Sequence, residues 1–494
     1  MILKPKRLTE SKIQILKKRY VHGLVIATMG ILGGQSLAHS QVALNKDATH
    51  QLASNSVKSG IALPFTLLKA DWGAPTTNQT IKIHNGGFGS DAATHPSKPN
   101  QFYALTDRGP NTDFIGDQGE GKQFLIPDYS PKIGLFELTN SGQIRLIKQI
   151  VLKTAQNKPI NGLPNPSELG ATHEIAYDLQ GAPLTVHPNL PFDPKTNPTK
   201  TDLNGLDAEG LAALNDGTFW VSDEYGPHIV HYNQAGREIG RINAFANDPR
   251  NNVVVNGKKI LLPAEFANRR ANRGMEGLTI TTDQSTLVGI MQSAMDNPDK
   301  SGRKSVLTRI VTINLKSGEL RQYLYPQNQA GYSNSGIVAI NDHEFYVIER
   351  DGKFPLQDTN SQKHIYKIDL KGATNIQNLT PSKRMTYDPK LGLMIDNKTL
   401  EQWSAGRSDV LEKLLELKIR PVKKQLVLDA VAALNYPHDK LEGLWLRRDG
   451  KLGLINDDDF SVETQNNVIL QKYLDKDNKI LDVNRLYVID PKAQ

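Results

Sequence analysis

The stretch LDAEGLAALNDGTFWVSDE, residues 206–224, contains two short apolar segments on either side of Asn215-Asp216-Gly217. This pattern predicts a β-hairpin, because a turn rich in Asn, Asp and Gly joins two antiparallel strands tightly. Glu209 stands near the start of the stretch, and Asp223 and Glu224 stand at its end. Since a hairpin returns the chain to where it began, we expect these carboxylates to lie close to one another.

A similar order of polar residue, strand, turn and second strand recurs along the chain. The copies are GSDAATHPSKPNQFYALTDRGPN (89–111), GMEGLTITTDQSTLVGIMQ (274–292), NSGIVAINDHEFYVIERDG (334–352) and KLEGLWLRRDGKLGLINDDDF (440–460). Several copies continue into two further strands, as at 229–232 and 238–242. Repeated units of four short strands are typical of a β-propeller. We therefore predict an all-β fold, a β-propeller of five to six four-stranded blades.

The last unit ends with a strand expected at 485–489, after which the chain stops. An early strand at 65–70 is expected to complete this unit, which closes the ring and removes an exposed sheet edge. Residues 379–441 depart from the repeat, and 408–419 predict an amphipathic helix, so we expect a short helical insertion near 401–420. This interval is either an insertion or a degenerate sixth blade. The alternative for the whole pattern is a β-sandwich of unrelated hairpins.

The N-terminal segment, residues 1–40, predicts a signal peptide. It holds seven basic residues and one acidic residue, with an apolar run at 21–32 and small residues within 36–40. The run is shorter than the ~20 residues of a transmembrane helix, so a cleaved leader is favoured over an uncleaved membrane anchor. We expect 41–60 to be a flexible linker and 61–494 to form the propeller domain.

Composition indicates an exported protein that does not bind nucleic acid. The net charge of +7 belongs mostly to the leader, so no basic face for nucleic acid is expected. The chain has no cysteine, which excludes a lipoprotein anchor, disulfides and thiolate sites. No later apolar run is long enough to span a bilayer. We expect a periplasmic or secreted protein with no stable membrane span once the leader is removed.

The repeated carboxylates predict a metal site at one mouth of the propeller channel. The first strand of each blade lines the channel, so acids at equivalent places converge, and carboxylates a few ångströms apart repel unless a cation neutralises them. Calcium fits best, because it takes six to eight oxygen ligands and needs neither Cys nor His; another divalent metal is the alternative. The predicted metal ligands are Glu209, Glu276, Glu442, Asp107, Asp223 and Asp457.

Three arginines lie beside these acids in the repeats, namely Arg108, Arg273 and Arg350. Guanidinium groups bind phosphate and carboxylate well, so we expect these residues to bind substrate. The simpler alternative is that each arginine neutralises a neighbouring acid. With a metal polarising an ester and activating water, the predicted catalytic residues are Asp223, Glu224 and Asp457.

The motifs occur in an order that resembles the family named for the esterase-like activity of phytase, also called phytase-like domain proteins, over about 86–460. The motifs are Asp107-Arg108-Gly109, Glu209-Gly210-Leu211 with Val221-Ser222-Asp223-Glu224, Asn272 to Leu278, Glu349-Arg350-Asp351, and Glu442-Gly443-Leu444 with Asn456 to Phe460. The resemblance implies a secreted phosphoester hydrolase that depends on calcium. The Asp-Asp-Pro-Ala type of signature found in well-characterised β-propeller phytases is absent, which argues against phytate as the substrate.

The leading hypothesis is therefore an exported, metal-dependent hydrolase of small phosphoester substrates. One alternative is a lactonase or carboxylesterase that uses a single calcium ion in the channel. The other is a calcium-stabilised binding module without catalytic activity. The arginines distinguish the first two, because phosphoester hydrolysis needs them and lactone hydrolysis does not.

Overall fold

The computed structural model describes residues 60–73, 80–169 and 174–492. The predicted signal peptide and all of the predicted linker except Gly60 lie outside the described residues. No helix in the described ranges is long and apolar enough to cross a membrane.

Five antiparallel sheets of four strands each dominate the part of the chain that the structure describes, which confirms the all-β prediction. In hydrogen-bonded order, the first sheet contains β4 (Asp91–Thr94), β5 (Gln101–Leu105), β8 (Lys132–Leu138) and β9 (Ile144–Val151), and the second contains β11 (Ala208–Ala213), β12 (Phe219–Asp223), β13 (His228–Tyr232) and β14 (Glu238–Asn243). The third sheet contains β17 (Gly277–Ile280), β18 (Thr286–Ile290), β19 (Leu307–Asn314) and β20 (Leu320–Pro326), and the fourth contains β21 (Ser333–Ala339), β22 (Glu344–Arg350), β23 (Lys363–Asp369) and β27 (Lys423–Asp429). The fifth sheet contains β28 (Gly443–Leu446), β29 (Leu452–Ile455), β32 (Arg485–Ile489) and β1 (Ile61–Ala62).

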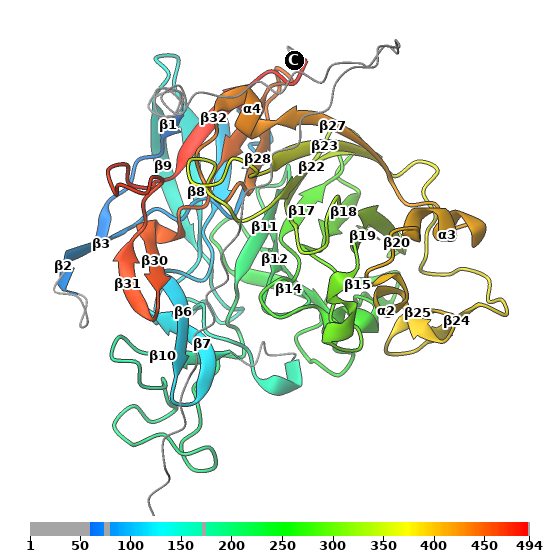
Figure 1. Cartoon of the computed structure of the whole chain (residues 1–494), viewed down its shortest axis with the longest axis horizontal. Coiled ribbons are helices and arrows are strands. Elements are labelled where there is room, and N and C mark those ends of the chain that lie inside the picture. Colours follow the sequence, from blue (N-terminus) through cyan, green and yellow to red (C-terminus); the bar gives the residue numbers. More distant parts are fainter. Residues whose placement is uncertain (1–59, 74–79, 170–173, 493–494) are drawn as a thin grey trace, which may run out of the picture. The chain divides into compact units, whose positions relative to one another are not determined.

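The first strands of the five sheets are neighbours of one another. Strand β4 contacts β11, β11 contacts β17, β17 contacts β21, and β21 contacts β28, which in turn contacts β4. In Figure 1, β11, β17 and β28 lie near the centre, while β9, β20 and β27 lie further out. Each sheet therefore begins at the centre of the arrangement and extends outward, as in propeller-like proteins.

The first strands approach closely because several of them carry a glycine at the point of contact. A Cβ atom added to Gly210 would lie 2.6 Å from the backbone nitrogen of Leu278, and one added to Gly336 would lie 2.4 Å from the backbone oxygen of Glu442. For Gly277 the corresponding distance to the backbone nitrogen of Ile337 is 3.1 Å. The repeated glycine thus leaves room for the backbone of the next sheet.

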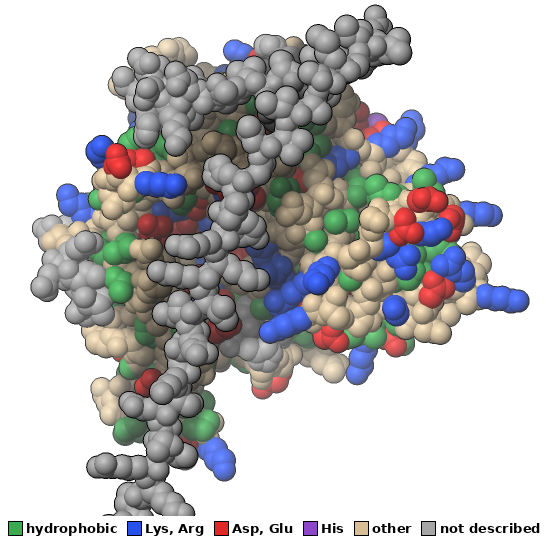
Figure 2. Space-filling view, viewed as in Figure 1, with side chains coloured by type: hydrophobic (Ala, Val, Ile, Leu, Met, Phe, Trp, Pro, Cys, Tyr) green, Lys and Arg blue, Asp and Glu red, His purple; other side chains and the backbone are tan. Residues whose placement is uncertain are grey.

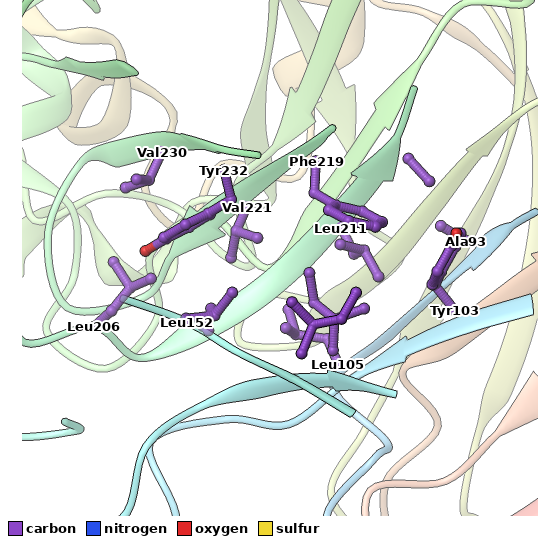
Figure 3. Close-up of a cluster of buried hydrophobic side chains, with 14 of the residues drawn as sticks. Ala93, Tyr103, Leu105, Leu152, Leu206, Leu211, Phe219, Val221, Val230 and Tyr232 are labelled. Carbon is purple, nitrogen blue, oxygen red and sulfur yellow. The ribbon is translucent and has the colours of Figure 1, made fainter. Parts of the chain in front are cut away.

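Apolar side chains fill the space between neighbouring sheets. Between the first and second sheets, Tyr103 and Leu105 of β5 pack against Leu211 of β11 and Phe219 and Val221 of β12 (Figure 3). Similar buried clusters join the second sheet to the third, the third to the fourth, the fourth to the fifth and the fifth to the first. Burial of apolar surface at each of these contacts is the main stabilising contribution to the fold.

The strand that completes the fifth sheet is not the one predicted. Strand β1 pairs with β32, with Ile61 opposite Leu486, whereas the predicted strand at 65–70 overlaps β2 (Leu67–Gly73), which pairs with β3 (Thr80–His84) in a separate sheet. The prediction was wrong because it relied on apolar residues that remain exposed. The side chain of Phe65 is 44% exposed, whereas Leu63, next to β1, is buried.

The interval 379–441 contains an insertion between β23 and β27 of the fourth sheet. A small sheet of β24 (Met385–Asp388), β25 (Gly392–Ile395) and β26 (Lys398–Thr399) is followed by α2 (Leu400–Ser404) and α3 (Val410–Glu416). Leu414 of α3 is buried in a cluster with α2 and β25. The short helical insertion expected near 401–420 is therefore present.

The remaining described elements are short and lie outside the five four-stranded sheets. They are β6 (Asn111–Gly116), β7 (Gly119–Phe124), β10 (Ile175–Tyr177), β15 (Val254–Val255), β16 (Lys258–Lys259), β30 (Val462–Gln465), β31 (Val468–Gln471), α4 (Ala430–Leu434) and four 3₁₀ segments, η1 (Ser167–Leu169), η2 (Ala264–Asn268), η3 (Lys300–Lys304) and η4 (Asp459–Ser461).

We predict that Gly336→Ala destabilises the protein by about 1–3 kcal/mol, because its new methyl group meets the backbone of the neighbouring sheet. Gly352→Ala is the matched control, since no heavy atom lies within 4 Å of its added Cβ. Chemical denaturation of the two variants measures the difference. Equal unfolding free energies for both variants would contradict the close approach.

Candidate functional site

A polar pocket of about 430 Å³ lies where the first strands of the sheets begin, and we call it the acidic pocket. The predicted residues among those that line it are Asp107, Arg108, Glu209, Glu224, Arg273, Glu276, Arg350 and Glu442. Lining residues that the sequence did not single out include Asp207, Asn272, Asp439, Lys440, Asp459 and Lys472. Residues from all five repeats therefore meet in one place.

The repeats converge because three of the acids stand at the start of a first strand. Glu276 and Glu442 directly precede the glycines that begin β17 and β28, and Glu209 precedes Gly210 in β11. Since these glycines lie where the first strands approach closely, the preceding side chains reach a common space at one end of the strands.

Three carboxylates form a tight cluster, which we call the carboxylate triad: Asp107, Asp207 and Glu209. One oxygen of each lies within 4.8 Å of one oxygen of the others, and all three residues are buried. Asp107 accepts a hydrogen bond from the backbone nitrogen of Gly109 at 2.9 Å, whereas no described residue donates a hydrogen bond to Glu209. Burial, followed by the charges of Asp207 and Glu224, raises the pKa of Glu209 well above its usual range. A cation would relieve this repulsion.

Asp207 is the member of the triad that the sequence analysis missed. It lies two residues before Glu209, directly before β11, and its carboxylate lies in the same cluster as that of Glu209. Its Oδ2 atom is 3.2 Å from Nη1 of Arg108 but accepts no hydrogen bond. The two-residue spacing between Asp207 and Glu209 is the sequence signal that could have identified Asp207.

Two further carboxyl groups of the pocket accept hydrogen bonds from the same side-chain amide. Nε2 of Gln292 donates a hydrogen bond to Oε1 of Glu224 at 3.0 Å and another to Glu276. The second oxygen of Glu276 is buried and has no hydrogen-bond partner in the described structure. Burial, with the charge of Glu276 next, raises the pKa of Glu224 well above its usual range. Glu224 therefore favours a protonated form at a higher pH than an exposed glutamate.

The three predicted substrate-binding arginines have different surroundings. Arg108 is buried beside Asp207 and donates a hydrogen bond to the Tyr225 hydroxyl at 2.9 Å, and Arg350 forms an ion pair with Glu442. For Arg108 and Arg350 the structure therefore supplies the acidic partners that the simpler alternative requires.

Arg273 differs from the other two arginines. Its Nη1 lies 3.0 Å from the backbone oxygen of Gly331 and 3.4 Å from Oγ of Ser333. No carboxylate of the described residues lies within ion-pair distance of it. Arg273 is therefore the predicted arginine that is most available to an anionic ligand.

The other two predicted carboxylates, Asp223 and Asp457, do not line the pocket. Asp223 accepts hydrogen bonds from the backbone nitrogens of Asp207, Tyr225 and Gly226, each at 3.0 Å. It therefore holds the segments that carry the triad and Glu224. Asp457 receives a hydrogen bond from Nζ of Lys440 at 2.8 Å, so its charge is already matched.

Two lysines, the buried Lys472 and the half-buried Lys440, complete the charge balance on the side of the fifth sheet, and neither was predicted. Nζ of Lys472 lies 2.6 Å from Asp459, 3.0 Å from Asp439 and 3.4 Å from Asp482. Burial alone lowers a lysine pKa, but these carboxylates outweigh it and raise the pKa of Lys472 well above its usual value. The acids on this side are therefore neutralised by the chain itself, in contrast to the carboxylate triad.

Residues 83–460 match the family model Phytase-like, described as the esterase-like activity of phytase. The match covers most of the chain, so the chain belongs to this family, whose description supports a hydrolase. An uncharacterised secreted protein of Arthroderma benhamiae is 30% identical over 247 residues, which are 44% of this chain and 47% of that protein. This chain thus matches about half the length of that relative.

Solved structures resemble the chain only distantly. A glycosyl hydrolase from Bacteroides ovatus is 10% identical with a TM-score of 0.34, over 87% of this chain and 91% of that one. A periplasmic gluconolactonase of Pseudomonas aeruginosa is 10% identical with a TM-score of 0.29, over 83% and 90% of the two chains. Likeness at this level says nothing about the function of this chain.

We predict that Lys472→Met lowers the free energy of unfolding by about 3 kcal/mol, because Asp439 and Asp482 lose their lysine partner, although Asp459 keeps its ion pair with Lys440. This value is at the low end for a broken buried ion pair, since Asp459 is 28% exposed. Lys479→Met removes the exposed ion pair to Asp477 and is the control, for which we expect no measurable change. Urea denaturation of both variants tests the difference, and a neutral Lys472→Met would show that the lysine is not needed.

Proposed function

We propose that the protein is a metal-dependent hydrolase of phosphoesters and that the acidic pocket is its active site. The observation that carries this proposal is the carboxylate triad, three buried carboxylates for which Arg108 is the only matching cation among the described residues. Arg273, which has no carboxylate partner among the described residues, lines the same pocket. Membership in the phytase-like family supports hydrolysis as the reaction.

The donor atoms of the pocket fit a divalent cation that prefers oxygen, such as calcium. Asp107, Asp207 and Glu209 would hold the ion, and the unpartnered second oxygen of Glu276 is a further donor. Glu442 is held by Arg350 and serves the pocket mainly through that ion pair. When bound, the ion would supply a Lewis acid for the ester and for water.

The chain's own residues supply binding and proton transfer. Arg273 binds the phosphoryl oxygens through its guanidinium group, and Arg108 and Arg350 add positive charge around the pocket. Glu224 is the proposed proton donor or acceptor, because it lines the pocket and burial keeps it protonated to a higher pH. Asp223 and Asp457 act as positioning residues through their hydrogen bonds to the backbone and to Lys440.

We also infer that the five sheets form a closed five-bladed propeller. The inference is supported by the contacts between successive first strands, including β28 with β4, and by the apolar cluster between the fifth and first sheets. The pairing of β1 with β32 would close the ring by joining the two ends of the domain in one sheet. A closed ring would leave the acidic pocket at one mouth of its channel.

Export to the periplasm or the medium is part of the same proposal. It rests on the basic and apolar leader, residues 1–40, and is supported by the name of the relative from Arthroderma benhamiae, which calls that protein secreted. The compartment suits the site, since an extracellular or periplasmic setting offers calcium at concentrations that weaker oxygen sites need.

We predict that Glu209→Gln and Asp207→Asn each weaken calcium binding at least about tenfold, because each removes a charged ligand from the triad. Asp113→Asn is the control: Asp113 lines the same pocket, but its carboxylate is paired with Lys122. Calorimetric titration of calcium into chelator-treated protein gives the affinities. Chelation is also expected to lower the melting temperature of the wild type.

Unchanged calcium affinity in both variants, together with an unchanged melting temperature after chelation, would refute the metal site. A weakened affinity in Asp113→Asn equal to that in Glu209→Gln would mean that general negative charge, rather than direct ligation, attracts the ion.

We predict that Arg273→Ala lowers kcat/KM for phosphomonoesters at least about tenfold, since it removes a charged hydrogen-bond donor to the phosphoryl group. It leaves hydrolysis of lactones and carboxylesters unchanged, because these substrates carry no such anion. Arg321→Ala, which removes an exposed arginine paired with Glu319, is the control. Activity on lactones without activity on phosphoesters in the wild type would favour the calcium-containing lactonase or carboxylesterase, for which the triad alone would suffice.

A further inference from the structure

A second concave region adjoins the acidic pocket and has the opposite charge. It has a volume of about 760 Å³ and shares Asp113, Lys122, Asn272 and Arg273 with the acidic pocket. We call it the basic cleft, after its basic lining residues Lys122, Arg269, Arg270, Arg273, Lys300 and Arg303. Figure 2 shows several Lys and Arg side chains close together near the centre of the viewed face.

The acids that line the cleft match only part of this positive charge. Lys122 is paired with Asp113, and Arg303 makes two hydrogen bonds to Asp296, at 2.7 and 2.6 Å. Arg270 has no carboxylate of the described residues within ion-pair distance. Together with Arg273, it leaves two guanidinium groups in the cleft without an anionic partner in the part of the chain that the structure describes.

Arg270 and Arg273 stand at the two ends of one tight turn, where an isolated β-bridge pairs them. The nitrogen of Arg273 donates a hydrogen bond to the carbonyl oxygen of Arg270 at 3.1 Å, across a turn in which Asn272 has φ 54°. Burial, and then the charges of Arg273 and Arg303, lowers the pKa of Arg270 to about 10. A shift of this kind means that the charged form is destabilised in its present surroundings, which an anion would reverse.

The position of the basic cleft next to the acidic pocket indicates which molecule would carry such an anion. Arg273 lines both regions, so a ligand that reaches from one to the other passes this side chain. Surface lysines such as Lys258 are exposed and surrounded by solvent, whereas Arg270 is half-buried. Partial burial of an unmatched charge costs free energy, and a bound anion would offset that cost.

We propose that the basic cleft binds a second anionic group of the substrate while the reacting ester lies in the acidic pocket. The preferred substrates would then be esters that carry a phosphate or carboxylate group away from the reacting bond. This inference rests on the proposed function, because it assigns the ester to the acidic pocket. Arg270 would recognise the distant group, and Arg273 would contact the substrate where the two regions join.

Binding of a probe that cannot be hydrolysed tests the cleft independently of catalysis. Butane-1,4-disulfonate and butane-1-sulfonate differ only in the second anionic group, and neither contains an ester bond. With calcium-saturated wild-type protein, we expect calorimetry to show that the disulfonate binds at least about tenfold more tightly. This preference should decrease as ionic strength rises.

Arg270→Ala should abolish the preference and leave butane-1-sulfonate binding unchanged. Lys258→Ala, on β16 outside the cleft, is the control and should retain the preference. Lys300→Ala, which changes an exposed residue of the cleft, should reduce the preference and keeps the test valid if Arg270→Ala does not fold. A wild-type protein without the preference, or an Arg270→Ala variant that keeps it, would overturn the proposal.

Activity measurements separate this inference from the proposed function. Butane-1,4-diol bisphosphate should have a lower KM than butyl phosphate in the wild type, and Arg270→Ala should remove the difference. If neither ester is hydrolysed but the disulfonate preference depends on Arg270, the proposed catalytic function fails and the anion-binding cleft stands. If both esters are hydrolysed with the same KM, the cleft fails and the hydrolase stands.

Discussion

The close approach of the first strands of the five sheets is the constraint on which the rest of the structure depends. At Gly210 and Gly336 the space that a side chain would need is filled by the backbone of the next sheet. The recurring Glu-Gly-Leu sequence combines this requirement with a leucine that faces the core and a glutamate that faces the acidic pocket, as at Glu209 and Leu211. The motif that allows the sheets to pack therefore also brings the carboxylates together.

Bringing the carboxylates together costs electrostatic free energy, and the protein supplies partners for some of these carboxylates but not for others. Asp223 is satisfied by three backbone N–H groups, Asp457 by Lys440, and Glu442 by Arg350. Within the described ranges, the only cation paired with the carboxylate triad is Arg108, which also contacts Glu174. An acid that the protein itself pairs with a cation or with N–H donors stabilises the fold or positions its neighbours. A buried acid without such a partner is stabilised by binding an external cation. The difference in pairing, rather than acidity itself, separates the scaffold from the proposed site.

The sequence was sufficient for the features that repeat and insufficient for those that occur once. The hairpins and the converging glutamates follow from periodicity and turn residues, so strands such as β12 and β29 were predictable. Strand β1 is too short for any alternation to be visible, and its pairing with β32 depends on contacts across the whole domain. Asp207 has no equivalent in the other copies, and Lys472 lies outside the repeat, so neither could be recognised by comparing copies. Whether Asp223 faced the pocket or the backbone depended on local hydrogen bonds that alternation does not reveal.

The two adjoining regions of opposite charge make sense together only if a cation occupies the acidic pocket. Without a cation, the negative charge of the carboxylate triad would repel an anionic ester from the region of the pocket that Arg273 lines. A divalent ion would reverse the sign of the potential at the triad, so that an anion could lie along both the ion and the guanidinium groups. The carboxylate triad and the unpaired arginines would then act together. The triad would bind the ion, and the ion and the arginines would bind the substrate.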